Sequence, residues 1–167
     1  MKTAPHEIDI AVTSIAIASD HAGFKYKAFL KSHLESNGIK VDDFGTDSPA
    51  PVDYPDFVRA AARSVVDGKN TLGIIVGGSG NEAIVANRHR GIRCAVVWNE
   101  QTARLAKEHG DCNMIAIGQR MMSKEEAIAV VDTWLAADFK GGRHQRRIDQ
   151  IDEITKNQNG RTASDIL

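Results

Sequence analysis

The segment that decides the fold is "TLGIIVGGSGNEAIVANR", residues 71–88, in which an apolar run ends in a glycine-rich loop. The run 71–77 is continuous and aliphatic, as expected of a parallel strand that is buried on both faces. The glycines that follow allow the backbone to approach a ligand closely, and N–H groups at a helix start attract anions. The segment therefore predicts a buried strand, an anion-binding loop and a short helix over 82–88.

The rest of the chain repeats this order of strand and helix. Apolar runs predict further strands at 13–19, 39–45, 92–98 and 112–118, and helical spacing predicts helices at 23–38, 56–68, 99–110 and 123–139. The proline-rich stretch 46–55 is expected to be a loop, and the basic segment from 141 to lead into a short helix. This order predicts an α/β protein: one three-layer αβα domain around a five-stranded, parallel, doubly wound sheet, with a C-terminal arm.

Length and composition narrow the class of protein. The 167 residues fit one domain, which we place at 13–156, between an N-terminal extension (1–12) and a polar tail (157–167). A net charge of −1 gives no reason to expect a nucleic-acid partner. Cys94 and Cys112 have neither disulfide-framework nor metal-site spacing, so we predict no metal. No apolar run reaches the roughly 18 residues of a membrane span, and the N-terminus is unlike a signal peptide, so a soluble cytoplasmic protein is expected.

Polar residues stand where the predicted strands end. The first strand leads to Asp20 and His21, the third to the glycine loop, and the fifth to Arg120. The helix after the fourth strand ends in His109. Ligands of doubly wound sheets bind at the carboxyl ends of the strands. We therefore predict that these groups gather along one edge of the sheet and form a site.

The glycine loop admits several interpretations. It lacks the Lys-Ser/Thr pair of a phosphate-binding P-loop. Gly78, Gly80 and Ala83 match a loose dinucleotide-binding pattern, but that fingerprint belongs on the first strand, where Asp20 and His21 stand instead. A purely structural tight turn is a further alternative. A small anionic or polyhydroxy ligand held by backbone amides fits the loop best.

Six motifs between Ile15 and Ile154 together resemble one known family. They are "SDHAGF", "DYPDF", "GGSGN", "ANRHRGIRCA", "EHGDCNMIAIGQRM" and "RHQRRI". In this order and spacing they resemble the ribose-5-phosphate isomerase B (LacAB/RpiB) family of sugar-phosphate isomerases. The resemblance implies a Rossmann-like or flavodoxin-like fold, no cofactor, and a homodimer or dimer of dimers whose active sites are shared between the two subunits of a dimer.

The resemblance also implies a reaction, the interconversion of ribose 5-phosphate and ribulose 5-phosphate in the pentose phosphate pathway. Such an aldose–ketose isomerase needs a base beside the substrate carbonyl and donors that stabilise an enediolate. Carried over from the family, Glu82 is the base and Ser79 relays a proton. The backbone at Gly77, Gly78, Gly80 and Asn81 forms the oxyanion cradle. Without the resemblance, Glu82 reads equally well as an ordinary acid at a helix N-terminus.

The remaining roles are likewise implied by the resemblance. His109 opens the sugar ring, and the sugar is contacted by Asp20, His21, Tyr54 and Gly110. The phosphate is held by Arg120 of the same chain and by Arg143 and Arg147 of the partner subunit.

Two departures from the family keep alternatives open. The loop is one residue shorter than in the family, and Gly110 stands where an asparagine is usual. If the missing residue precedes Glu82, the carboxylate faces the loop; a gap within the helix rotates it by about 100°. A related four- to six-carbon sugar phosphate, or non-catalytic anion binding, therefore stays possible.

Overall fold

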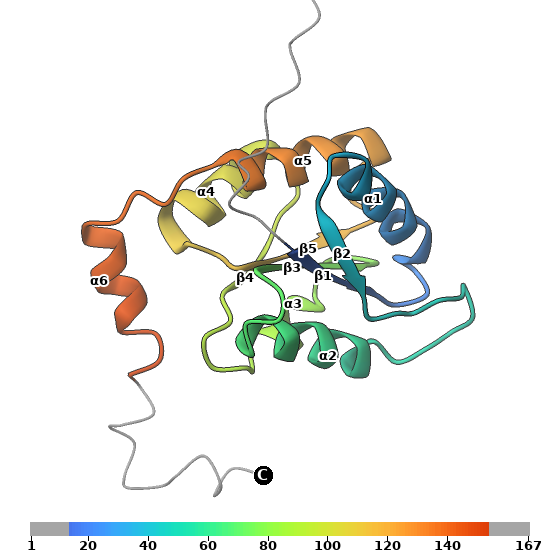
Figure 1. Cartoon of the computed structure of the whole chain (residues 1–167), viewed down its shortest axis with the longest axis horizontal. Helices are drawn as coiled ribbons and strands as arrows, with labels where there is room; N and C mark the ends of the chain where they lie inside the picture. Colours follow the sequence, from blue (N-terminus) through green and yellow to red (C-terminus); the bar gives the residue numbers. More distant parts are fainter. Residues whose placement is uncertain (1–13, 154–167) are drawn as a thin grey trace, which may run out of the picture.

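The structure of the protein is a computed structural model that describes residues 14–153. This part of the chain folds in three layers, with a central sheet between two layers of helices (Figure 1). The N-terminal extension (1–12) and the polar tail (157–167) expected from the sequence lie outside the described residues. None of the helices between residues 14 and 153 has the length and the apolar composition of a membrane span.

All neighbouring strands of the sheet are parallel, which confirms the predicted architecture. The strands are β1 (Ser14–Ser19), β2 (Lys40–Asp43), β3 (Leu72–Gly77), β4 (Cys94–Val96) and β5 (Met114–Gly118). Their order is β2-β1-β3-β5-β4, the flavodoxin-like order with its last two strands exchanged. The direction of winding reverses between β1 and β3, where doubly wound proteins bind their ligands.

The helices cover the two faces as right-handed crossovers require. They are α1 (Phe24–Ser36), α2 (Tyr54–Val66), α3 (Ala83–Ala86), α4 (Glu100–Gly110), α5 (Lys124–Ala136) and α6 (Arg143–Asp149). Helices α1, α4 and α5 lie on one face and α2 and α3 on the other, while α6 stands beside the layers (Figure 1). The prediction of a loop over 46–55 is wrong for its last two residues, because α2 already begins at Tyr54. Pro55 is tolerated in the first turn of this helix, where no N–H donor is needed.

Two apolar clusters hold the layers together, and the alternation of side chains along β1 separates them. Ile15 and Ile17 are fully buried against the α1 and α5 layer, which includes Trp134. Ala16 and Ala18 face α2 on the other side. The small alanine side chains leave room for α2 to approach the sheet closely.

A buried ion pair fixes the loop beside the end of β1. Lys27, only 2 % exposed, donates from Nζ to Asp43 Oδ1 at 2.5 Å and to the carbonyl of Thr46 at 2.6 Å. The backbone of Ser19 pairs with this loop, since its N–H donates to the Gly45 carbonyl at 2.7 Å and its carbonyl accepts from Thr46 at 2.9 Å. The start of the Asp20–His21 segment is therefore held from two sides.

Candidate active site

The side chain of Glu82 is buried beneath the glycine loop. Its exposed fraction is 5 %, and a Cβ built on Gly77 would lie 2.0 Å from the Glu82 Cδ and from Oε1. The carboxylate thus fills the space beside Gly77, and the outward rotation that a gap within the helix would cause is not observed. Oε2 has no hydrogen-bond partner in the described chain. A buried acceptor without a partner costs about 1–3 kcal/mol, so this group is suited to meet a ligand.

The backbone next to this carboxylate offers unused donors. Within the described chain, the N–H groups from Gly78 to Glu82 donate no hydrogen bond. The loop is nevertheless fixed, because the carbonyls of Gly77 and Gly78 accept from Gln119 at 2.9 Å and from Arg120 at 3.2 Å. Free amides around a buried carboxylate form a cradle for an anionic or developing oxyanionic ligand.

The helix predicted over 82–88 is shorter in the structure. Helix α3 has four residues, with Glu82 at its N-cap position. It stops before the predicted end at 88, because the Asn87 side chain turns to bond the backbone N–H and carbonyl of Cys94, each at 2.8 Å. So short a helix has a small dipole, and Gly77 and the loop place the carboxylate instead.

Asp20, His21 and Tyr54 line an open cavity of about 450 Å³, a volume typical of small-molecule sites. Asp20 is 8 % exposed and accepts the N–H of Gly23 on Oδ1 at 2.8 Å. The exposed His21 ring accepts the Val52 N–H on Nδ1 at 3.3 Å, which leaves Nε2 available to a ligand.

Arg120 joins the same edge of the sheet. Its guanidinium lies over the glycine loop, with Cζ 3.4 Å from where a Cβ on Gly78 would be. The structure therefore brings Arg120 next to the loop of Glu82 at the carboxyl ends of β3 and β5. The exposed Ser79 hydroxyl and Asn81 belong to this loop as well.

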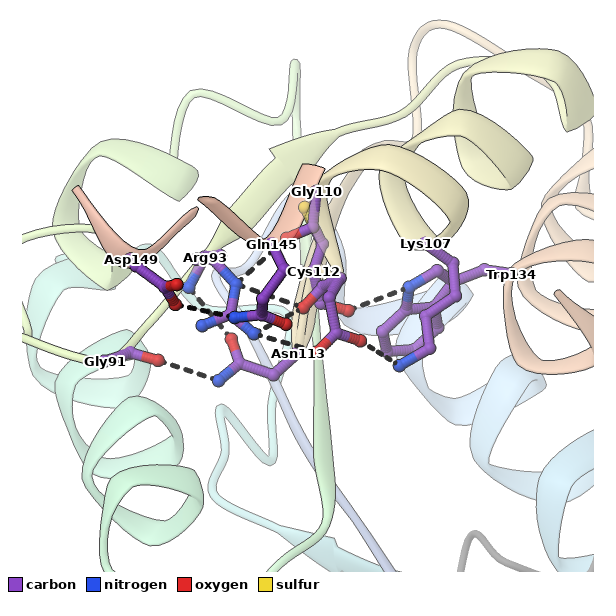
Figure 2. A network of polar contacts seen from close by, with 10 residues as sticks. Gly91, Arg93, Lys107, Gly110, Cys112, Asn113, Trp134, Gln145 and Asp149 are labelled. Carbon is purple, nitrogen blue, oxygen red and sulfur yellow. Dashed lines mark hydrogen bonds and ion pairs between the residues drawn. The ribbon is translucent and has the colours of Figure 1, made fainter. Parts of the chain in front are cut away.

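The prediction that His109 shares this edge is wrong for a single chain. Helix α4 runs antiparallel to the strands, so its last residues return to the amino edge of the sheet. Arg93, just before β4, donates from Nε to the carbonyl of Gly110 at 2.9 Å (Figure 2). A strand of five residues spans about 17 Å, so His109 and Gly110 lie at the opposite end of the sheet from Glu82.

A polar network fixes the turn that follows His109 (Figure 2). Asp111 ends α4 in the left-handed conformation, at φ 39°. Arg93 donates from Nη2 to the Asp111 carbonyl at 2.7 Å, and Lys107 donates to Oδ1 of Asp111 at 2.7 Å. Trp134 donates to the carbonyl of Cys112 at 3.2 Å. The end of α4 is therefore a rigid platform.

Helix α6 packs against this platform and presents Arg143 and Arg147, both exposed and four residues apart. Its one buried residue, His144, was missed by the sequence analysis. The His144 ring stacks on His109, with ring centroids 4.3 Å apart and planes 8° from parallel. The histidine between the arginines of "RHQRRI" was the available signal. Burial, followed by the nearby His109, Arg143, Arg147 and Lys140 side chains, lowers the pKa of His144.

The two cysteines are not suited to act as nucleophiles or metal ligands. Cys94 and Cys112 are buried free thiols, and burial raises the pKa of Cys112 to about 11, which leaves it protonated and unreactive at neutral pH. Within residues 14–153, no three histidine, cysteine, aspartate or glutamate side chains gather as metal ligands do.

Comparison with known proteins gives one answer. Residues 15–151 match the family of ribose/galactose isomerases (LacAB/RpiB). Ribose-5-phosphate isomerase B of Mycolicibacterium paratuberculosis is 46 % identical over 145 residues, which cover 85 % of this chain and 91 % of that protein. The Escherichia coli enzyme of the same name is 38 % identical, over 87 % of this chain and 98 % of its own.

Solved structures agree. The ribose 5-phosphate isomerase of Thermotoga maritima superimposes with a TM-score of 0.83 at 44 % identity, covering 84 % of this chain and 98 % of that one. Ribose-5-phosphate isomerase B of Mycoplasma genitalium, solved with bound ribulose-5-phosphate, gives a TM-score of 0.82 at 38 % identity, covering 87 % and 97 %.

A doubly wound sheet with a buried carboxylate and free amides at its winding reversal defines an α/β protein with a ligand site at that point, and the relatives place it in the sugar-phosphate isomerase class. This chain belongs to the ribose/galactose isomerase (LacAB/RpiB) family.

Proposed function

We propose that this protein is an aldose–ketose isomerase that converts ribose 5-phosphate to ribulose 5-phosphate, in the cytoplasm and as part of the pentose phosphate pathway. The observation that carries the proposal is the Glu82 carboxylate, buried against Gly77 with one oxygen unpaired and free amides beside it. The Mycoplasma genitalium relative with bound ribulose-5-phosphate supports this class of substrate.

The reaction needs one group to move a proton between two neighbouring carbons. Glu82 takes the proton from C2 of the open-chain aldose and returns it to C1, so the carboxylate ends as it began. In between, the two substrate oxygens share the enediolate charge, which the amides of Gly78 to Asn81 stabilise. The exposed Ser79 hydroxyl passes a proton from one of these oxygens to the other.

Ring opening precedes this step. The imidazole of His109 protonates the ring oxygen and receives the proton of the anomeric hydroxyl, so the furanose opens without net change in charge. Asp20, His21 and Tyr54 hold the sugar in the 450 Å³ cavity. No metal or cofactor enters this proposal.

We propose that two subunits complete each site, because the catalytic groups of one chain lie at opposite edges of the sheet. The edge of one subunit that carries Glu82 and Arg120 then meets the opposite edge of its partner. There the partner's His109 completes the catalytic groups. The partner's Arg143 and the partner's Arg147 hold the phosphate together with Arg120. Ile84, Trp98 and Met121 support this contact. They follow β3, β4 and β5 and are 58 %, 55 % and 61 % exposed, as an apolar surface awaiting a partner would be.

A complementation experiment tests the proposal. Glu82→Gln and His109→Asn are each expected to inactivate a homodimer on ribose 5-phosphate, since general acid–base groups contribute about 100- to 10,000-fold. A mixed dimer has one site with both changes and one with neither. Co-expression of the two variants should therefore restore about a quarter of the wild-type activity.

Other outcomes contradict it. If Glu82 and His109 act within the same subunit, each site in a mixed dimer carries one change, and no activity returns. Wild-type protein that binds ribose 5-phosphate without converting it would favour the non-catalytic alternative. Because Gly110 offers no side chain to the sugar, four- and six-carbon aldose phosphates belong in the same assay.

A further inference from the structure

Helix α6 is held to the domain through the last turn of α4. Lys140, just before α6, donates its N–H to the carbonyl of Glu108 at 3.0 Å, and its Nζ lies 2.5 Å from Oε2 of Glu108. The next contact is the ring of His144 on that of His109. As His144 is the only residue of α6 that is buried, it is the anchor of this helix.

The stack is also what orients the ring of His109. Within the described chain, the His109 ring makes no hydrogen bond, whereas an imidazole that transfers protons is commonly fixed by a carboxylate or a carbonyl at one nitrogen. Face-to-face packing at 4.3 Å fixes the plane of the ring and leaves the edges of both nitrogens open. One nitrogen can then give a proton to a sugar oxygen while the other takes one.

We propose that His144 is a positioning residue that sets the ring plane of His109 and, through the same contact, places Arg143 and Arg147. It thereby joins ring opening to phosphate binding in one rigid unit. The proposal rests on the proposed function, in which His109 opens the ring and the two arginines hold the phosphate.

The surroundings of His144 give the unit a dependence on pH. His109 faces it from α4, and Lys140, Arg143 and Arg147 surround it on its own segment, while Glu108 of α4 pairs with Lys140. The pKa of His144 is lowered in the folded chain, where α6 is docked on α4. As the pH falls below about 6.5, His144 is therefore protonated more readily in chains whose α6 has left α4. Docking of α6 is therefore fully present above that pH and weakens as the solution becomes acid.

Three variants separate this role from a general structural one. His144→Ala removes the stack, and His144→Phe keeps a flat ring that cannot titrate. Gln145→Ala is the control, because Gln145 is exposed and its side chain donates only to Asp149 of the same helix, at 2.7 Å. Each is assayed on ribose 5-phosphate and on a four-carbon aldose phosphate, which cannot close to a furanose. Hydrogen exchange of the α6 amides is measured at pH 7.5 and 5.5.

With His144→Ala, we expect kcat on ribose 5-phosphate to fall at least tenfold and KM to rise for both substrates, while kcat on the four-carbon substrate stays within threefold. His144→Phe should retain kcat within threefold and lose the acid-induced increase in α6 exchange. Gln145→Ala should match wild type in kcat and KM on both substrates. Equal losses of kcat on both substrates, or no rescue by phenylalanine, would overturn the positioning role.

The exchange measurement does not depend on catalysis. If wild-type protein converts neither substrate, the proposed function fails, yet faster α6 exchange in His144→Ala would still establish the anchor. Unchanged α6 exchange in His144→Ala would overturn the anchor whatever the activity.

Discussion

A methyl group added at residue 77 would occupy the place of the Glu82 carboxylate. In Gly77→Ala the new Cβ would lie 2.0 Å from Cδ and Oε1 and 2.3 Å from Oε2, whereas ordinary contact begins at 3.4 Å. Gly77 does not need a left-handed φ, so alanine fits the backbone and the carboxylate moves instead, by about 1.4 Å.

The expected cost of this displacement is catalytic. A misplacement of 1 Å at a catalytic group lowers the rate about 100-fold, or about 2.7 kcal/mol in activation free energy. We expect kcat on ribose 5-phosphate to fall by at least this factor with KM almost unchanged, because the phosphate ligands are untouched. The free energy of unfolding should fall by about 1–3 kcal/mol, because the methyl overpacks a buried site.

A matched control lies on the same face of the same strand. In Gly73→Ala the methyl would meet the flexible end of Met114, with Cε at 2.7 Å, far from the loop. This variant should lose about 1–3 kcal/mol of stability and keep kcat within threefold. Steady-state kinetics and thermal unfolding of both variants decide the matter. Gly77→Ala with kcat within threefold of wild type would refute the role of the Glu82 carboxylate as base.

Two further predictions concern Glu82 and Lys27. Glu82→Gln should abolish exchange of the substrate's carbon-bound hydrogen with solvent deuterium, followed by NMR, and leave phosphate affinity unchanged; full exchange would assign the proton transfer elsewhere. Lys27→Met leaves Asp43 without its closest partner and should lower the free energy of unfolding by about 1–3 kcal/mol, measured by thermal unfolding. Lys31→Met is the control. It removes a weaker and more exposed contact with Asp43, at 3.5 Å, and should lower the free energy of unfolding by less than about 1 kcal/mol. Burial raises the pKa of Asp43, but the Lys27 side chain and the Gly45 N–H lower it by more, so the net shift is downward. The stability that the ion pair provides is therefore present above about pH 4, and the stability lost in Lys27→Met should shrink below that pH. A loss that stays constant into acid would contradict the ion pair as its cause.

The central strands were predictable because a strand that is buried on both faces has a continuous apolar sequence. The runs that became β1, β3 and β5 are continuous and apolar, and the structure places them at the centre of the sheet. The edge strands β2 and β4 proved shorter than the predicted 39–45 and 92–98, since each pairs on one side only. Capping also showed in the sequence. Asn99 and Ser123 begin α4 and α5, each with a complete capping box.

The direction of Glu82 could not be settled from the sequence. A loop one residue short is compatible with a carboxylate on either side of the following helix, because one residue turns a helix by about 100°. The absence of a side chain at Gly77 decides it, and that space appears only when β3 and α3 are packed together.

By itself, the sequence determined the order of strands and helices, the glycine loop and the family, since each is written in local pattern and spacing. Only the tertiary structure decided which edge of the sheet each polar group reaches. His109 lies in the last turn of a helix that runs back against the strands, so it lies with Arg143 and Arg147 and apart from Glu82. The contact of His144 with His109 could not be predicted from the sequence either. More than thirty residues separate α6 from the end of α4, and the pattern of so short a helix does not indicate which surface it packs against.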